Sequence, residues 1–255
     1  MFKLAATVAF AATLVSGAAI AQPVKPTIVL VHGAFADSSS WNGVIINLQK
    51  DGYKTVAVAN PLRSVSNDAH LVSDVVGSIK GPVVLVGHSY GGLIISNAAN
   101  GHNNVKSLVY VAAFAPDSGE SASDLAGKFP GATLGDALAA RVKLTDGGAD
   151  LYIDQTKFHD QFAHDVPAEA SALMAVGQRP IAEAALAEES GEPAWKALPS
   201  YFVYGDSDKN IPAKALGFMA ERAGSRRTVV VEGASHVVMV SHPKVVTDLI
   251  EEAAK

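Results

Sequence analysis

Short runs of apolar, mostly β-branched residues alternate along this chain with stretches that carry a helical hydrophobic pattern. Runs this uniformly apolar are typical of parallel strands buried on both faces. Their alternation with helices predicts an α/β sheet covered by helices on both sides. The predicted strands occupy residues 27–31, 55–58, 82–86, 105–113, 201–204 and 228–231, and predicted helices occupy residues 39–51, 67–80, 212–223 and 243–254, with another after residue 89.

One long interval interrupts this alternation. Between residues 114 and 199 we find no clear strand, and the helical patterns cover residues 121–128, 134–142, 168–176 and 181–189. A strand-free stretch of this length between two sheet strands is best explained as an inserted helical cap. We therefore expect an α/β core from residues 22–113 and 200–255, with the cap at residues 114–199.

The N-terminal residues have the pattern of an export signal. Lys3 is the only charge in the first 24 positions, an apolar stretch follows over residues 4–15, and Ala19-Ile20-Ala21 resembles a cleavage site. We expect residues 1–21 to be removed as a signal peptide and the protein to be periplasmic or secreted. The apolar stretch is short for a spanning helix, and no later one is long enough, so we expect no stable membrane insertion after removal.

Composition excludes several classes of function. The chain has no cysteine, which excludes disulfides, thiolate nucleophiles and cysteine-ligated zinc. Its net charge is −5 and it has no concentrated patch of Lys and Arg, which argues against a nucleic-acid partner. Its length fits one sizeable domain with a full core, and no sequence feature specifies an oligomeric state.

The segment Gly87-His88-Ser89-Tyr90-Gly91 is a G-x-S-x-G motif between a predicted strand and a predicted helix. This strand–turn–helix setting is what a nucleophile elbow requires, because the tight bend pushes the serine outward. The flanking glycines avoid the clashes that a Cβ would make there. Ser89 is therefore the candidate nucleophile.

The partners of such a serine are expected at the same edge of the sheet, since ligands bind at the carboxyl ends of parallel strands. Asp206 and Asp208 follow the predicted strand 201–204, and His236 follows the strand 228–231. The imidazole would take the serine proton, and a buried carboxylate would orient the ring. The order Ser, Asp, His along the chain is the one found in α/β-hydrolases.

Acyl transfer also needs fixed donors for a negative oxygen. The amide of Tyr90 follows the nucleophile and begins a helix, so it is one candidate. The second is expected from the loop after the first strand, where Gly33 allows the turn and the amide of Ala34 or Phe35 would face the oxyanion.

Taken together, these segments resemble the α/β-hydrolase fold, in particular small bacterial esterase-like proteins related to plant hydroxynitrile lyases and methyl esterases. The matching segments are 30–35 with Trp41, 86–92, 205–212 and 233–236. The resemblance implies a mostly parallel sheet of about six strands, a small-molecule ester as substrate, and neither a metal nor an organic cofactor. Its G-x-x-D-x-x-x-P pattern selects Asp208 as the acid, with Asp206 in reserve.

Several other residues near the proposed site have alternative interpretations. His32 is expected to order the oxyanion loop, His88 to point away from Ser89, and His242 to cap the last helix, although His242 is the competitor of His236 as base. Ser39 and Ser40 are polar residues at the start of a helix that could also contact substrate.

In the cap, Phe158 and Phe162 are four residues apart on one helical face, with His159 beside them. They either line an acyl pocket or pack the cap onto the core. The pocket assignment makes all three candidate substrate contacts.

These observations favour a serine hydrolase that cleaves carboxylic esters through an acyl-enzyme. One alternative is a hydroxynitrile-lyase-like C–C lyase with the same triad, for which a cap lysine such as Lys157 or Lys143 would stand near the site. Another is a non-catalytic ligand-binding protein on the same fold. An epoxide hydrolase or dehalogenase is disfavoured because it needs an aspartate in place of Ser89.

Overall fold

The computed structural model describes residues 1–3, 24–145 and 147–255 of the 255-residue chain. The predicted export signal, residues 1–21, lies outside the described residues except for its first three positions. Among the helices of the described segments, none is long and apolar enough to cross a membrane.

A six-stranded parallel sheet forms the centre of the molecule, in the order β2-β1-β3-β4-β8-β9. This confirms the predicted parallel sheet of about six strands. The inner strands β1, β3, β4 and β8 are almost entirely buried, as their apolar runs indicated. The strands are β1 (Thr27–Val31), β2 (Lys54–Val58), β3 (Val83–His88), β4 (Val105–Val111), β8 (Ser200–Gly205) and β9 (Arg227–Val231).

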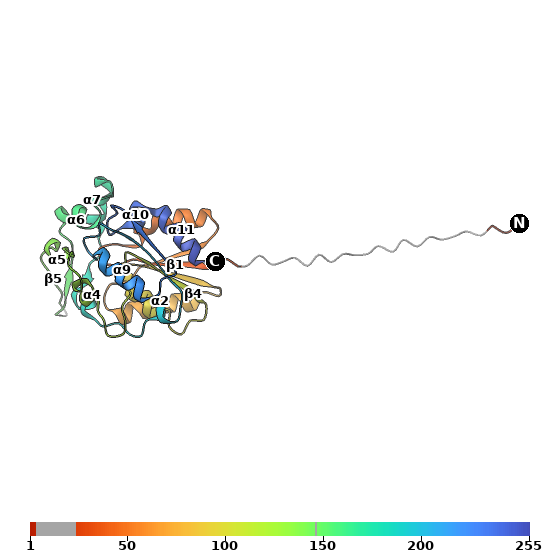
Figure 1. Ribbon diagram of the computed structural model, residues 1–255, viewed down its shortest axis with the longest axis horizontal. Helices are drawn as coiled ribbons and strands as arrows, with labels where there is room; N and C mark the ends of the chain where they lie inside the picture. The colour runs from red at the N-terminus through yellow and green to blue at the C-terminus, as the bar shows by residue number, and fades with distance from the viewer. Residues whose placement is uncertain (4–23, 146) are drawn as a thin grey trace.

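Helices cover both faces of this sheet (Figure 1). On one face α1 (Asn42–Lys50) packs against α11 (Pro243–Ala253), and on the other α2 (Val65–Ser78) packs against α3 (Gly91–Ala98). Helix α11 buries Val246, Leu249, Ile250 and Ala253, whose helical spacing forms one apolar stripe. The 3-10 helix η1 (Ser38–Trp41) precedes α1, α10 (Val238–Ser241) precedes α11, and α9 (Ala213–Arg222) packs on β8.

The insertion between β4 and β8 gathers at one end of the molecule (Figure 1). It contains α4 (Ala122–Gly127), α5 (Leu134–Ala137), α6 (Gln155–Phe162), α7 (Ala168–Gly177), α8 (Glu183–Ala187) and the 3-10 helix η2 (Ala194–Lys196). It also contains a three-stranded antiparallel sheet of β5 (Val142–Lys143), β6 (Ala149–Leu151) and β7 (Ile181–Ala182). The prediction of a strand-free cap is therefore corrected.

Two predicted cap helices are shorter than expected for the same reason. The helix predicted over residues 134–142 ends at Ala137, and the one predicted over residues 181–189 begins only at Glu183. Val142 begins strand β5 instead, and Ile181 and Ala182 form β7. A tight turn closes the hairpin of β5 and β6 through the Leu144 N–H, which donates to the Gly148 carbonyl. The Asp-Gly-Gly sequence at residues 146–148 is a hairpin signal that could have predicted this turn.

The strand order reverses direction between β1 and β3. The chain moves outward from β1 to β2, then returns past β1 to β3 and continues to the other edge. Such a switch point opens a crevice at the carboxyl ends of the two strands. The loop after β1 and the turn after β3 therefore face each other, which is where the predicted oxyanion loop and Ser89 lie.

Candidate active site

Ser89 occupies a strained turn between β3 and α3. Its backbone has φ = 53°, in the left-handed region that residues with a side chain rarely adopt. The turn is held by the Ser89 carbonyl, which accepts from the N–H groups of Gly92 at 2.9 Å and Phe114 at 3.2 Å. Ser89 is 7% exposed and lines a cavity. This is the geometry of a nucleophile elbow.

Two glycines permit this turn and its close neighbours. A Cβ on Gly87 would lie 2.6 Å from the Gly91 carbonyl oxygen, so the elbow cannot close around a larger residue. A Cβ on Gly33 would lie 2.6 Å from the Cβ of Ser89. The loop after β1 thus packs against the elbow at Gly33, where the absence of a side chain permits the close approach.

His236 and Asp208 form a buried pair at the ends of adjacent strands β8 and β9. The Nδ1 of His236 lies 2.7 Å from Oδ2 of Asp208, and both side chains are almost completely buried. The other oxygen of Asp208, Oδ1, accepts from the N–H groups of Asn210 and Ile211 at 2.7 and 3.0 Å. His236 lines the same cavity as Ser89, so the structure brings the three predicted residues to one site.

Asp206, the reserve candidate, lies elsewhere. Its Oδ1 accepts from the Gly233 N–H at 2.7 Å and from the Ser207 hydroxyl at 3.1 Å, on the exposed side of the same loop. These bonds link the loops after β8 and β9. Asp206 therefore braces the loop that carries Asp208, as expected of the aspartate that does not face the histidine.

The predicted oxyanion donors differ in whether their N–H group already donates a hydrogen bond within the protein. Among the described residues, no group accepts from the N–H of Tyr90 or of Ala34, and both residues line the Ser89 cavity. The N–H of Phe35 instead donates to the carbonyl of Arg179 in the insertion at 2.9 Å. The prediction that Phe35 could serve is corrected, and Ala34 is the available donor of that loop.

His32 orders the oxyanion loop, as predicted. Its Nδ1 lies 2.9 Å from the Gly33 carbonyl, so this nitrogen carries the proton, and its Nε2 accepts from the Asn60 N–H at 3.1 Å. The Asn60 amide donates to the His32 carbonyl in return. Burial lowers the pKa of His32 from 6.5 to about 4, so the ring is neutral at neutral pH.

His88 lies behind His236 rather than beside the serine. The two ring centroids are 4.8 Å apart, and Nε2 of His88 donates to the main-chain carbonyl of His236 at 3.1 Å. Burial lowers the pKa of His88 well below its ordinary value, so this ring is also neutral. It supports the His236 backbone without adding a charge to the site.

His242, the competitor for the role of base, lies away from this site. Its Nδ1 is 3.6 Å from Oδ2 of Asp165, it also contacts the Ser241 hydroxyl, and it does not line the Ser89 cavity. Within the part of the chain that the structure describes, no group of three or more His, Asp or Glu side chains could hold a metal ion.

The cavity beside Ser89 has a volume of about 310 Å³. Besides Ser89, His236 and the oxyanion residues, it is lined by small or apolar side chains from α4, α5, α8 and the loops after β4 and β8. These are Phe114, Ala122, Ser123, Ala126, Gly127, Ala132, Leu134, Gly135, Leu138, Leu186, Asn210 and Ile211. Sequence reasoning missed this set, although the small residues at positions 122, 123, 126 and 127 share one helical face and could have indicated it.

The three cap residues predicted for the pocket do not line it. Phe158 and Phe162 are fully buried, and the Phe162 ring packs against His236 and Phe35 at centroid distances of 5.2 and 6.2 Å. The Nε2 of His159 lies 3.0 Å from the Val166 carbonyl within the insertion. This corrects the pocket assignment: the aromatic pair packs the insertion onto the histidine, because the helix turns its apolar face inward.

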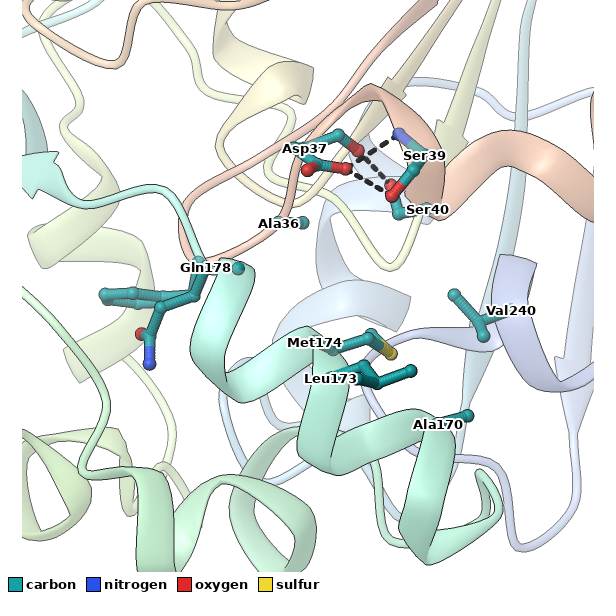
Figure 2. Close-up of a pocket in the computed structure, with 11 residues that line it drawn as sticks. Ala36, Asp37, Ser39, Ser40, Ala170, Leu173, Met174, Gln178 and Val240 are labelled. Atoms are coloured by element: carbon teal, nitrogen blue, oxygen red, sulfur yellow. Dashed lines mark hydrogen bonds between the residues drawn. The ribbon is translucent and has the colours of Figure 1, made fainter.

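A second hollow of about 260 Å³ lies between α7 and the loop after β1. Figure 2 shows Leu173 and Met174 projecting from α7 toward Val240 of α10, with Ser39 and Ser40 across the gap. The hydroxyls of both serines are bonded to Asp37. The two serines thus line this separate hollow and not the Ser89 cavity.

The phenol of Tyr90 reaches a buried carboxylate behind the elbow. Its hydroxyl donates to Oδ2 of Asp68 at 3.3 Å, and the Arg63 N–H donates to the same carboxylate. Burial raises the pKa of Asp68. The hydrogen bond to Asp68 fixes the side chain of Tyr90, the residue whose main-chain amide is a candidate oxyanion donor. Sequence patterns did not indicate Asp68, because it looks like an ordinary helix residue.

Comparison with known proteins agrees with the fold. The pattern that defines the alpha/beta hydrolase family matches residues 28–249, and the chain belongs to this family. The resemblance drawn from the sequence is thereby confirmed.

Individual relatives have different activities. A pimeloyl-acyl carrier protein methyl ester esterase of Aeromonas hydrophila is 28% identical over 89% of this chain and 94% of its own length. An alpha-hydroxynitrile lyase of Arabidopsis thaliana is 25% identical over 90% and 97%, respectively. The crystal structure of polyneuridine aldehyde esterase matches with a TM-score of 0.79 at 19% identity, covering 91% of this chain and all of that one.

Proposed function

We propose that this protein is a serine hydrolase that cleaves carboxylic esters of small molecules. The observation that carries the proposal is the buried Asp208–His236 hydrogen bond of 2.7 Å, at a cavity that Ser89 also lines. Two main-chain amides at this cavity, those of Tyr90 and Ala34, donate to no group of the described residues. This is the set of groups that acyl transfer requires.

In the proposed reaction, His236 removes the proton from Ser89 as its oxygen attacks the ester carbonyl. Asp208 holds the proton on Nδ1, which leaves Nε2 as the base, and stabilises the imidazolium that forms. The negative oxygen accepts from the amides of Tyr90 and Ala34. His236 then protonates the departing alcohol, and water releases the acyl group by the same steps.

The lyase alternative is less well supported by the cavity. We expected a cap lysine near the triad, but no lysine of the described residues lines the Ser89 cavity. The ammonium of Lys157 donates to the Asp136 carbonyl at 2.7 Å, and Lys143 lies exposed on β5. Hydrolysis needs no such cation.

The test is the Ser89→Ala variant with p-nitrophenyl butyrate as substrate. We expect turnover to fall to the background rate while the circular dichroism spectrum stays unchanged, because only the attacking oxygen is lost. Hydrolysis by the variant at the parental rate would refute the assignment. If wild-type protein releases benzaldehyde from mandelonitrile and cleaves no ester, the lyase is correct; tight ligand binding without turnover would indicate a binding protein.

The N-terminal pattern supports a further proposal about location. We infer that residues 1–21 direct export and are removed, so that the protein acts in the periplasm or the medium. N-terminal sequencing of the protein from a secreting host is expected to begin at Gln22. An intact Met1 would contradict cleavage.

A further inference from the structure

One wall of the Ser89 cavity consists of residues with small side chains or none. Helix α4 contributes Ala122, Ser123, Ala126 and Gly127, and α5 contributes Gly135. The α4 residues recur at helical spacing, so one face of that helix borders the cavity.

The two glycines of this wall leave room that a side chain could occupy. A Cβ built on Gly127 or Gly135 meets no heavy atom within 4 Å, and neither residue has a positive φ. A side chain can therefore be added at either position without a clash, whereas a Cβ on Gly87 would collide with the Gly91 carbonyl oxygen. Both residues line the cavity and are themselves exposed, so the open space in front of them is the outer, solvent-facing end of the cavity.

The cavity also lacks charge. None of the described residues that line it is an Asp, Glu, Lys or Arg, and the polar groups outside the predicted machinery are Ser123 and Asn210. The Asp208 side chain is fully covered and paired with His236. An ionised group in the inner part of this cavity, beside the buried Ser89 and Ile211, would lose its water without gaining a partner, which is strongly unfavourable.

We propose that the cavity binds an uncharged, apolar acyl chain of medium length, and that Gly127 and Gly135 set the length it accepts. The inference rests on the proposed function, since the acyl group is the one transferred to Ser89. A volume of about 310 Å³ lies at the low end of the range for small-molecule sites, which favours chains of medium length over long fatty acyl chains.

The first experiment compares p-nitrophenyl esters with the wild-type protein. We expect kcat/KM to rise from acetate to about hexanoate or octanoate, since each buried methylene contributes roughly a fourfold gain, and to fall for dodecanoate. Mono-p-nitrophenyl adipate replaces the terminal methyl of the hexanoyl chain by a carboxylate. We expect it to be at least about 100-fold poorer than the hexanoate at pH 7.

The second experiment adds side chains to the wall formed by α4 and α5. In Gly135→Leu and Gly127→Leu the new side chain occupies the space of the chain terminus, so we expect kcat/KM for the hexanoate to fall at least about tenfold. The acetate, which stays next to Ser89, is expected to change less than about twofold. Gly81→Leu is the matched control, since an added Cβ there also meets nothing within 4 Å and Gly81 does not line this cavity.

The outcomes separate this proposal from the proposed function. Adipate less than about 100-fold poorer than the hexanoate, or folded glycine variants whose ratio of hexanoate to acetate kcat/KM falls less than about fivefold, would overturn the acyl-chain inference while ester cleavage stands. If no ester is cleaved in a Ser89-dependent way, the proposed function itself fails. Should the leucine variants not fold, Gly135→Ala with the octanoate replaces them, and an unchanged chain-length profile again counts against the proposal.

Discussion

Asp208 uses its two carboxylate oxygens for different purposes. Oδ1 accepts from two main-chain N–H groups of its own loop, and Oδ2 faces Nδ1 of His236. The loop therefore orients the carboxylate before the histidine binds to it. This arrangement lets a single substitution test the role of the carboxylate.

In Asp208→Asn the side-chain oxygen is expected to keep the bonds to the loop, which turns the NH₂ group toward His236. Nδ1 must then accept, so the proton moves to Nε2 and the ring can no longer take the proton of Ser89. We expect kcat for p-nitrophenyl butyrate to fall about 10³- to 10⁴-fold. Asp206→Asn, which can keep the Gly233 bond, is the control and is expected to stay within about threefold.

His32 makes the stability of the oxyanion loop depend on pH. Its pKa of about 4 in the folded protein lies below the ordinary 6.5, because burial disfavours the charged ring. The stabilising contribution of the neutral ring is complete above pH 6.5 and is lost as the pH falls toward 4, at a cost of about 3 kcal/mol.

His32→Asn removes this titration. We expect the variant to be less stable than the wild type at pH 7, but its free energy of unfolding should fall less between pH 7 and pH 4, by about 3 kcal/mol. Urea unfolding at both pH values measures the difference. Equal losses in the two proteins would mean that His32 is not the titrating group.

At the scale of elements, the insertion contacts the oxyanion loop directly. The Arg179 carbonyl accepts the Phe35 N–H, and Phe35 has φ = 60°. The segment that carries this carbonyl is held by Gln178, whose buried amide bonds to both main-chain groups of Ile153 and to the Ala175 carbonyl. Gln178 therefore joins the end of α7 to the segment that follows β6 and steadies the link to the loop.

Loss of this amide is expected to loosen the link. In Gln178→Ala three buried main-chain groups lose their partner, so we expect a destabilisation of about 2 kcal/mol and a several-fold lower kcat with little change in KM. Thermal unfolding and kinetics with p-nitrophenyl butyrate measure the two effects. Gln49→Ala removes an exposed side chain that donates a hydrogen bond to the Thr55 hydroxyl, and it is expected to change neither.

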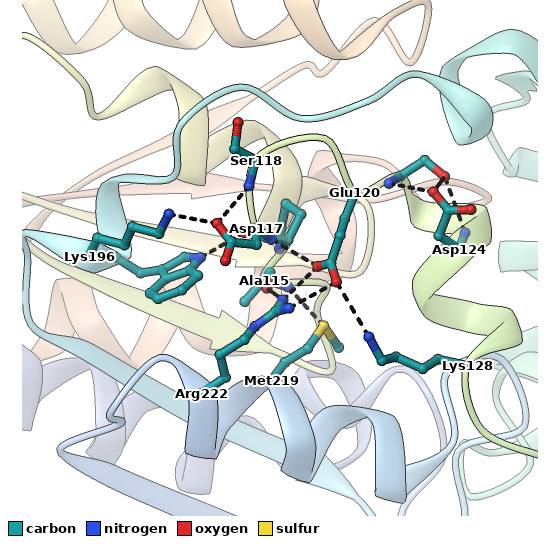
Figure 3. Close-up of polar contacts among 12 residues, drawn as sticks. Ala115, Asp117, Ser118, Glu120, Asp124, Lys128, Lys196, Met219 and Arg222 are labelled. Atoms are coloured by element: carbon teal, nitrogen blue, oxygen red, sulfur yellow. Dashed lines mark hydrogen bonds and ion pairs between the residues drawn. The ribbon is translucent and has the colours of Figure 1, made fainter.

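At the scale of the whole molecule, ion pairs attach the insertion to the core. Figure 3 shows Arg222, at the end of α9, bonded through two nitrogens to the carboxylate of Glu120, at 2.9 and 2.7 Å, and to the Ala115 carbonyl. On the other side, Arg63 bonds to Asp150 of β6 at 2.6 Å. The insertion is therefore held at separate points, and its wall of the cavity stays in place relative to Ser89.

Removing the charge of Glu120 tests the first of these attachments. Hydrogen bonds from Arg222 hold the pKa of Glu120 below its usual 4.5, so the pair stabilises the fold above that pH and loses its effect as the pH falls. We expect Glu120→Gln to lower the free energy of unfolding by about 1 kcal/mol at pH 7, since partial exposure screens the pair. The difference should vanish in acid, and a constant difference would contradict the ionic cause.

The matched control is an exposed ion pair on α11, outside the insertion. Asp248→Asn removes the charge of the exposed Lys244–Asp248 pair, and we expect no measurable change in the unfolding midpoint. If Glu120→Gln and Asp248→Asn lower the free energy of unfolding equally, the Arg222–Glu120 pair stabilises the fold no more than an ordinary surface ion pair does.

The sheet, the elbow and the candidate triad could all be predicted from local sequence patterns. Residues 27–31 are strand β1 as predicted, and the glycines around Ser89 indicated the turn that the structure contains. These features depend on neighbouring residues: the period of apolar side chains sets the element, and backbone sterics set the turn.

The groups that surround the serine, in contrast, depend on how distant segments pack together. The occupied amide of Phe35 depends on the distant Arg179 carbonyl, and β6 pairs with β7 through residues as far apart as Asp150 and Ala182. The wall of Gly127 and Gly135 likewise borders the cavity only because the insertion docks on the core. Strands of two or three residues carry too little periodicity to be recognised, and contacts between distant segments follow from packing, which no local pattern encodes.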